Sequence, residues 1–154
     1  MGNTAYLGIG TNLGDKATHI RRAVELIGQR VGTVLAVSSF YQSEPWGFVS
    51  DNRFLNVAVQ VATSLSPMEL LRETQSIEKL MGRTEKTTST YADRIIDIDI
   101  LFYGQMVLDT ETLKIPHPLL PERDFVVIPL AEIAPQLIHP TLHLRMEELA
   151  DRYR

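Results

Sequence analysis

The sequence predicts an α+β domain in which helices pack against a mostly antiparallel sheet. Strand-like and helix-like segments follow one another in the order β-α-β-β-α-β up to Tyr103. This order is typical of the split βαβ, or ferredoxin-like, arrangement. After Gly104 the chain is rich in proline. We therefore expect a proline-rich C-terminal extension that covers part of the remaining surface and includes a short helix over residues 144–152.

The first three elements are a strand, a helix and a second strand. Residues 5–9 form a short apolar run, and residues 10–15 are rich in turn formers. The helix is indicated by four apolar residues at helical spacing: Ile20, Ala23, Val24 and Ile27. We expect this helix to stop at Gly32 and the next strand to cover residues 34–41. Residues 42–52 carry proline and glycine and are expected to form a loop.

The next three elements are a strand, a helix and a buried strand that carries acidic residues. Residues 54–62 alternate cleanly, with Phe54 and Asn56 on one face and branched aliphatic residues on the other. The run Ser66-Pro67-Met68-Glu69 combines an N-cap, a proline at the first helical position and a capping-box glutamate. We expect the helix that it opens to end at Gly82.

Composition excludes several classes of protein. A chain of 154 residues is enough for one domain with its own core, which we expect to cover residues 1–154. The absence of cysteine excludes disulfides, thiolate catalysis and cysteine-ligated metals. The net charge of −4 argues against nucleic-acid binding, and no apolar run approaches the ~20 residues of a membrane span. Because no basic-then-apolar signal segment precedes the first strand, we expect a cytoplasmic protein, and we expect a monomer.

The most informative segment is the strand-like run 94–103, in which one isoleucine separates two aspartates. Aspartate is depleted from strands and is rarely buried without a partner. Because side chains alternate along a strand, Asp97, Asp99 and Leu101 should share one face, and the other face should hold Ile96, Ile98, Ile100 and Phe102. The two carboxylates then stand roughly 7 Å apart at their backbones, close enough to bind the same hard cations. A solvated outer face is the alternative, but the apolar flanks favour a metal or phosphate site.

Several groups near this strand could bind phosphate. Arg83 and Arg94 flank the polar segment before it, and His117 and Arg123 follow it. Each of these, taken alone, is more often a surface residue than a ligand. His117 is distinguished by the prolines on both sides, which restrain its backbone in an extended conformation and would hold the imidazole still. Two further histidines, His139 and His143, lack such a context, and we expect them to be structural or exposed.

Other patterns in the sequence bear on ligand binding. The glycines at 8, 10 and 14 do not have the spacing of a dinucleotide-binding fingerprint, and a turn explains them. No phosphate-binding loop motif is present. Phe54 and Asn56 offer an aromatic face beside a carboxamide, which suits a flat heteroaromatic ring. A core phenylalanine and a turn-end asparagine would explain these two residues equally well.

Taken together, seven segments form a recognisable set: residues 10–14, 38–41, 54–56, 94–104, 115–118, 123–130 and 132–135. The run Arg94-Ile95-Ile96-Asp97-Ile98-Asp99 with its Pro116-His117 follower is the most specific of them. The set closely resembles 6-hydroxymethyl-7,8-dihydropterin pyrophosphokinase (2-amino-4-hydroxy-6-hydroxymethyldihydropteridine diphosphokinase) of folate biosynthesis. The resemblance runs nearly end to end. It implies transfer of pyrophosphate from ATP to the hydroxymethyl group of the reduced pterin, with release of AMP.

The resemblance also implies roles for individual residues. Asp97 and Asp99 match the positions that bind two Mg²⁺ ions bridging the ATP phosphates, and the catalytic set is completed by Arg83 and Arg94. The positions that match the ATP site are Gln75, Glu78, Arg94, Ile100, Lys114, His117 and Arg123. The positions that match the pterin pocket are Ser43, Pro45, Trp46, Phe54, Asn56, Tyr91 and Phe125. Among these, Phe54 and Phe125 are similar to rings that sandwich the pterin.

The polar segment 83–93 departs from the family pattern. Tyr91-Ala92-Asp93 stands where the family commonly has a tryptophan and a proline, and Glu85 stands where a basic residue is common. Thr112 and Lys114 also differ from the residues of some members. We expect the segment to be a lid that closes over both substrates, because it has no apolar stripe to tie it down.

Two other functions compete with this one. A ferredoxin-like regulatory module could bind a nucleotide without any chemistry, but a passive sensor has no need of paired metal ligands. A two-metal phosphodiesterase or nuclease would normally recruit more carboxylates and histidines than this strand supplies. No residue in the recognised motif is an obvious strong base, so we expect catalysis to depend on positioning and electrostatics.

Overall fold

The computed structural model describes residues 2–44, 53–82 and 95–154. The larger elements are β1 (Asn3–Thr11), α1 (Lys16–Arg30), β2 (Gly32–Val37), β3 (Tyr41–Ser43), β4 (Phe54–Thr63), α2 (Pro67–Leu80), β5 (Asp97–Tyr103), α3 (Asp124–Ile133) and α4 (Met146–Ala150). The smaller ones are β6 (Leu108–Asp109), β7 (Lys114–Ile115) and the 3₁₀ turns η1 (Leu120–Glu122) and η2 (Asp151–Tyr153).

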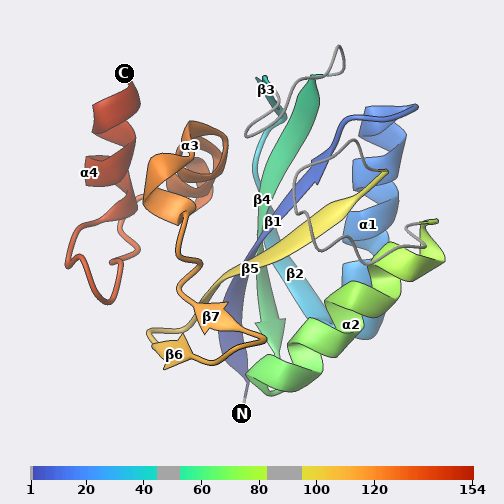
Figure 1. Cartoon of the computed structure of the whole chain (residues 1–154), viewed down its shortest axis with the longest axis horizontal. Coiled ribbons are helices and arrows are strands. Elements are labelled where there is room, and N and C mark those ends of the chain that lie inside the picture. The colour runs from blue at the N-terminus through green and yellow to red at the C-terminus, as the bar shows by residue number, and fades with distance from the viewer. Residues whose placement is uncertain (1, 45–52, 83–94) are drawn as a thin grey trace.

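One antiparallel sheet organises the domain, with its strands in the order β2-β4-β1-β5. The short strand β3 pairs with the beginning of β4, and β6 and β7 form a separate hairpin. Helices α1 and α2 lie on one side of the sheet, and α3 and α4 lie on the other (Figure 1). The predicted α+β class is therefore confirmed. The C-terminal helices complete the second layer.

Two apolar cores fill the spaces between these layers. The larger core joins α1 and α2 to the sheet through residues such as Leu7, Ile27 and Ile77, which are fully buried. The second core joins α3 and α4 to the opposite face through residues such as Phe102 and Leu130. Most residues of β1, β4 and β5 are thus covered on both faces, whereas β2 exposes every second residue. A polar side chain on one of the covered strands is costly to bury unless it has a partner.

The predicted capping box at the start of α2 is confirmed. The Ser66 side chain accepts a hydrogen bond from the Glu69 backbone N–H, and the Glu69 carboxylate accepts one from the Ser66 N–H. Pro67 occupies the first turn, where its missing N–H costs nothing. The helix ends just before Gly82, whose φ of +101° is a conformation that favours glycine. These local signals place α2 without reference to the rest of the fold.

The single strand predicted over residues 34–41 is wrong, because the chain forms two strands there. Ser38 lies between β2 and β3. Its backbone N–H donates to the Ala58 carbonyl, but the Ala58 N–H donates to the Ser38 hydroxyl, at 2.9 Å in both cases. A side-chain oxygen thus takes the place of a backbone carbonyl in the ladder, and regular pairing stops. Strand β3 then resumes beside β4 at Tyr41.

The predicted alternation along β5 holds for the isoleucines but is wrong for Phe102. The register against β1 shifts so that Tyr6 pairs with Phe102 while Leu7 pairs with Ile100. Leu101 is therefore an extra residue in a β-bulge, and the residues beyond it exchange faces. Phe102 consequently packs in the second core with Leu101, and Tyr103 packs in the first.

Helix α3 was not predicted from the sequence. Pro129 lies inside it, and an interior proline usually argues against a helix because it removes one backbone hydrogen bond. Here Pro129 and Leu130 are buried against the sheet, so tertiary packing outweighs the local penalty. The short terminal helix predicted over residues 144–152 is observed as α4 followed by η2. Among the described residues, no helix is long and apolar enough to cross a membrane.

Candidate functional site

The aspartates of β5 lie beside polar residues of two neighbouring strands. Gly10 of β1 pairs with Asn56 on one side and with Asp97 on the other, so these three residues form one row across the sheet. Gly8 pairs in the same way with Ala58 and Asp99, two residues further along. Directly opposed residues share a face. Because Ala58 packs in the second core, both aspartates and Asn56 face the side of the sheet that carries α3.

Glycine at position 10 leaves room for this row. A Cβ atom there would lie 3.0 Å from Asn56 Oδ1 and 3.6 Å from a ring carbon of Phe54. The first distance is too short for a relaxed contact, so any larger residue would displace the Asn56 amide. The glycine that the sequence suggested to be a turn residue instead allows a carboxamide to lie over the middle strand.

Arg123 connects α3 with the aspartate strand. It precedes the first residue of α3, and its Nη1 lies 3.9 Å from Asp99 Oδ2. The guanidinium also lies over the Phe125 ring, 5.6 Å from its centroid. Arg123 is only 8% exposed. A charged guanidinium held in such surroundings attracts anions more strongly than one in water, because the effective dielectric constant is lower.

A carboxylate of helix α2 is hydrogen bonded to the outer edge of β5. Glu78 of α2 accepts a hydrogen bond of 2.8 Å from the backbone N–H of Ile98, which lies between the two aspartates. Among the strands that the structure describes, β5 is the last of the sheet, and none of them offers this N–H a partner on that side. Glu78 therefore fixes the strand at the point where Asp97 and Asp99 are presented.

Asn56, one of the residues matched to the pterin pocket, is hydrogen bonded to two residues of β3. Its Nδ2 donates to the Tyr41 carbonyl at 2.9 Å and to the Ser43 hydroxyl at 2.8 Å. Asn56 is 5% exposed, so these bonds satisfy an amide that would otherwise be costly to bury. Phe54 follows the same strand face, and Phe125 projects from the first turn of α3. Both rings are half-buried, as partners for a stacked ligand should be.

His117 is held by its own backbone and by a neighbouring turn. Its N–H donates to the Leu101 carbonyl at 3.1 Å, and its Nδ1 accepts from the Leu119 N–H at 3.2 Å. Nδ1 is thus an acceptor, which leaves Nε2 as the protonated nitrogen of a neutral ring. Burial, followed by the nearby Arg123 charge, lowers the pKa of His117 to about 4, and the opposing attraction of Asp97 is smaller. His117 is therefore a neutral hydrogen-bond donor at physiological pH.

This lowered pKa should make the protein sensitive to acid. Above pH 6.5 the neutral ring is favoured in both states, and the contribution to stability is complete. As the pH falls from 6.5 towards 4, the unfolded chain binds a proton that the folded protein does not, so folding is weakened. In His117→Asn the unfolding free energy should fall by about 1–3 kcal/mol less than in the parent protein between pH 6.5 and pH 4. Urea unfolding in magnesium-free buffer at several pH values measures it.

The control for this test is His143→Gln, since His143 is exposed at the surface. Only the slope of stability against pH is compared, because the two substitutions differ in other ways. An unchanged slope for His117→Asn would show that the ring is not held neutral. His139 contributes to the remaining slope: it is buried, its Nδ1 accepts from the Thr141 and Leu142 N–H groups, and burial lowers its pKa.

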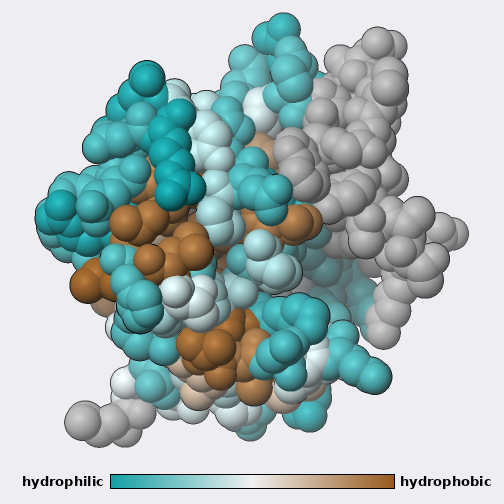
Figure 2. Space-filling view, turned by 60° about the vertical axis from the view of Figure 1, so that its left-hand side comes forward, coloured by the Kyte–Doolittle hydropathy of each residue, from teal (hydrophilic) through white to brown (hydrophobic). Residues whose placement is uncertain are grey.

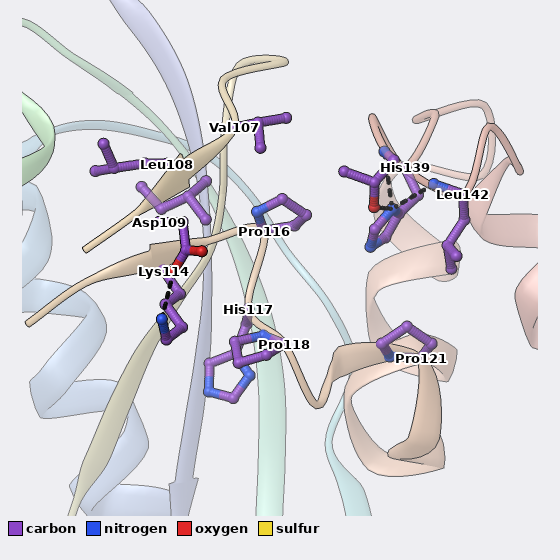
Figure 3. Close-up of a pocket in the computed structure, with 12 residues that line it drawn as sticks. Val107, Leu108, Asp109, Lys114, Pro116, His117, Pro118, Pro121, His139 and Leu142 are labelled. Atoms are coloured by element: carbon purple, nitrogen blue, oxygen red, sulfur yellow. Dashed lines mark hydrogen bonds and ion pairs between the residues drawn. The ribbon is translucent and has the colours of Figure 1, made fainter. Parts of the chain in front are cut away.

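A cavity of about 360 Å³ lies beside this site rather than in it. It is lined by the β6–β7 hairpin, the segment around His117 and the loop at 139–142 (Figure 3). His117 and Lys114 line it, but neither aspartate does. Apolar side chains gather among polar ones on this side of the molecule (Figure 2), and the exposed apolar residues nearby are Met106, Val107, Ile138 and Leu142.

The structure brings some of the predicted residues together and leaves others apart or undescribed. Ile100 is buried in the first core, Gln75 is exposed on α2, and Lys114 is exposed in an ion pair with Asp109. The residues of the predicted site that lie outside the described ranges are Pro45, Trp46, Arg83, Tyr91 and Arg94, and the predicted lid at 83–93 lies outside them as well. His139 is structural and His143 exposed, as expected.

No sequence pattern indicated the role of two residues that lie beside the matched ones. Tyr41 and Asp124 are hydrogen bonded to each other across 83 positions of the chain, at 3.1 Å. Tyr41 belongs to the recognised segment 38–41, and Asp124 directly follows Arg123, so both lay beside the named residues. Their contact could not be read from periodicity, since it depends on how α3 packs on the sheet.

The donor set fits a magnesium ion that arrives with its substrate. Within residues 2–44, 53–82 and 95–154, no group of three or more histidine, aspartate or glutamate side chains could hold a metal alone. Mg²⁺ is usually bound by one or two carboxylates together with substrate phosphates and water, not by an all-protein cage. Asp97 and Asp99, with the positive Arg123 nearby, match that requirement.

Comparison with known proteins gives a consistent answer. A family described as 7,8-dihydro-6-hydroxymethylpterin-pyrophosphokinase (HPPK) matches residues 6–135. The 2-amino-4-hydroxy-6-hydroxymethyldihydropteridine pyrophosphokinase of Aquifex aeolicus is 42% identical over 145 residues, which are 94% of this chain and 89% of that protein. The protein of the same name from Bacillus subtilis is 45% identical over 138 residues, 89% of this chain and 81% of its own length.

Solved structures show the same fold. The crystal structure of wild-type Plasmodium falciparum HPPK-DHPS aligns with a TM-score of 0.79 over 99% of this chain, at 19% sequence identity. This chain spans only 43% of that longer protein. At such low identity the likeness supports the fold alone, and the chemistry rests on the family and on the arrangement of the site.

Proposed function

This chain belongs to the 7,8-dihydro-6-hydroxymethylpterin-pyrophosphokinase family, and we propose that its described residues divide the reaction between a phosphate site on β5 and a pterin pocket at β3, β4 and α3. The protein transfers pyrophosphate from ATP to the hydroxymethyl group of 6-hydroxymethyl-7,8-dihydropterin, a step of folate biosynthesis. The observation that supports the assignment of residues is the row Asn56–Gly10–Asp97, in which the Asn56 amide and the Asp97 carboxylate share one face of the sheet with one strand between them.

In the phosphate site Asp97 and Asp99 would hold magnesium, as two ions if the resemblance applies, together with the phosphates of ATP. Bound magnesium supplies charge neutralisation, which lets an alcohol approach a triphosphate. Arg123 and the neutral His117 then contact phosphoryl oxygens, one by charge and one by an Nε2–H donor. Arg94 and Arg83 complete this site, as the resemblance implies. Gln75 and Glu78 lie on the side of the nucleoside in this proposal, and Lys114 belongs to the ATP site, as the resemblance implies.

The pterin pocket uses two rings and an amide. Phe54 and Phe125 enclose the flat substrate, and Asn56 and Ser43 bind its polar edge. The substrate hydroxymethyl group then points along the row towards Asp97, where its oxygen attacks the β-phosphorus and AMP leaves. Because the described side chains of the site include no obvious strong base, the rate is achieved by alignment and by stabilisation of charge on the phosphoryl oxygens.

The core of the sheet is ferredoxin-like in this proposal. Its support is the strand order β2-β4-β1-β5, in which β4 separates β2 from β1 and every neighbouring pair is antiparallel. The additions to that plan are β3, the β6–β7 hairpin and the C-terminal segment with α3 and α4. These additions supply Ser43, His117, Arg123 and Phe125, whereas the common core supplies the two aspartates of β5 and the Phe54 and Asn56 side chains of β4.

Loss of either ring should weaken pterin binding selectively. Phe125→Ala and Phe54→Ala each remove a stacking face worth about 0.5–1.5 kcal/mol beyond its buried area, so the pterin Kd should rise at least roughly threefold to tenfold. The affinity for a non-hydrolysable ATP analogue should stay within about twofold, because neither ring contacts phosphate in this arrangement. Calorimetric titration with each ligand measures both values. Equal losses of affinity for the two ligands would show that Phe54 and Phe125 do not form a pocket specific for the pterin.

The activity itself is tested by its products. Incubation with ATP, magnesium and the hydroxymethyl-dihydropterin should yield AMP and the pterin diphosphate in equal amounts. Release of ADP or phosphate instead would indicate a kinase or a hydrolase, and binding without any product would indicate a regulatory module. Each competing function therefore gives a different result.

A further inference from the structure

One tyrosine contacts both halves of the pterin pocket. The backbone carbonyl of Tyr41 accepts a hydrogen bond from Asn56 Nδ2 at 2.9 Å. Its hydroxyl, at the other end of the side chain, donates to Asp124 Oδ2 at 3.1 Å. Tyr41 thus joins strand β4, which carries the amide, to helix α3, which carries one of the rings.

Asp124 extends this connection to the aromatic ring. Its other oxygen, Oδ1, accepts from the backbone N–H of Phe125 at 2.8 Å. A carboxylate is stabilised in the first turn of a helix, where backbone N–H groups have no intrahelical partner. The residue on its other side is Arg123, which lies over the Phe125 ring and reaches Asp99. The Asp124 carboxylate is therefore at the junction of the pterin pocket and the phosphate site.

We infer that the hydrogen bond from Tyr41 to Asp124 is a positioning contact that sets the separation between the Phe125 ring and the Asn56 amide. This inference rests on the proposed role of Phe125 and Asn56 in binding the pterin. A flat ring can stack on the Phe125 face and meet the Asn56 amide with its polar edge only when the spacing between these two groups is fixed. Tyr41 is a positioning residue, since it acts through Asn56 and Asp124 and not on the substrate.

A second contact shows that α3 is attached to the sheet without Tyr41. Ser39 donates from its N–H to Glu132 Oε2 at 2.9 Å and from its hydroxyl to Glu132 Oε1 at 2.6 Å. Glu132 lies at the opposite end of α3 from Asp124. Buried apolar residues such as Val127 and Leu130 anchor the middle of the helix. Loss of the Tyr41 hydroxyl should thus release the first turn alone.

The protonation of Tyr41 suits this role. Burial, and after it the charge of Asp124, raises the pKa of Tyr41 above its ordinary value of 10.0. The hydroxyl accordingly keeps its proton over the whole physiological range and remains a donor to the carboxylate. A hydrogen bond to a charged group is also among the stronger ones in proteins.

The test is Tyr41→Phe, which removes one oxygen atom and leaves the backbone carbonyl that holds Asn56. The pterin Kd should rise roughly threefold to tenfold, the effect expected for the Phe125 ring that Tyr41 positions, because Tyr41 itself does not contact the substrate. The Kd of a non-hydrolysable ATP analogue should change by less than about twofold. The matched control is Ser39→Ala, which removes a hydroxyl-to-carboxylate bond at the other end of the same helix. It should leave both affinities unchanged.

A double variant separates positioning from general loosening. In a Phe125→Ala background the ring that Tyr41 positions is gone, so adding Tyr41→Phe should weaken pterin binding no further. Additive losses in the double variant, or an equal effect of Ser39→Ala, would overturn the inference. Should Phe125→Ala itself leave pterin binding unchanged, the proposed pocket fails. Should it weaken binding while Tyr41→Phe does not, only the positioning role fails.

Discussion

Replacing Asp97 or Asp99 by asparagine should lower turnover by at least about a hundredfold, the order of loss seen when a charge-stabilising contact to the reacting group is removed. Asparagine keeps the size of the side chain but not the negative charge that binds magnesium. The concentration of magnesium needed for half-maximal activity should rise as well. Steady-state rates over a magnesium titration measure both effects.

The fold should survive these substitutions. The two carboxylates repel each other without a metal, so removing one charge relieves that repulsion. Asp99 also faces the buried Arg123 guanidinium, so in a chelating buffer the unfolding temperature should fall more in Asp99→Asn than in Asp97→Asn, while both variants stay folded. The control is Asp151→Asn, which removes an exposed carboxylate far along the chain from β5. Near-normal turnover in Asp97→Asn and Asp99→Asn would contradict the metal site.

The second large effect is expected at Arg123. Arg123→Gln should lower kcat/KM by roughly a hundredfold, because a buried guanidinium that stabilises phosphoryl charge has no equal in a neutral amide. ATP affinity and kcat should both fall. The pterin Kd should change less, through the loss of the cation that lies over the Phe125 ring.

Arg22→Gln is the matched control, since Arg22 is an exposed arginine in a surface ion pair on α1. Surface pairs of this kind contribute little, so its kinetics should be those of the parent protein. Arg123→Lys is informative beside it. Lysine keeps the charge but not the planar group, so partial activity there would indicate that charge matters more than geometry. An unchanged ATP affinity in Arg123→Gln would place Arg123 outside the phosphate site.

Much of the fold follows from local patterns. The capping box, the proline at the first turn and the terminal glycine place α2 because they act within a few residues of one another. Alternation identifies β4, and the unusual aspartates in an apolar run identify β5 as the strand with the chemistry. His117 and Arg123 were singled out by the same sequence, through neighbouring prolines and a family pattern. Each of these signals is short-range.

The parts that the sequence could not supply depend on contacts between distant segments. The bulge that moves Phe102 to the second core arises from pairing with β1, and the break at Ser38 arises from its bond to Ala58. Helix α3 forms despite Pro129 because its apolar face is buried against the sheet. In each case a long-range interaction outweighs a local preference that is weaker in free energy.

The site divides in the same way. By itself the sequence determined which side chains of suitable chemistry are available for metal, phosphate and a flat ring, because that chemistry belongs to the residue type. Only the tertiary structure decided that Gly10 makes room for Asn56, that Glu78 secures the edge of β5, and that Tyr41 and Asp124 connect the two halves of the pocket. Positions and spacings of this kind arise when the sheet and α3 pack together, since packing brings together groups that no local pattern relates.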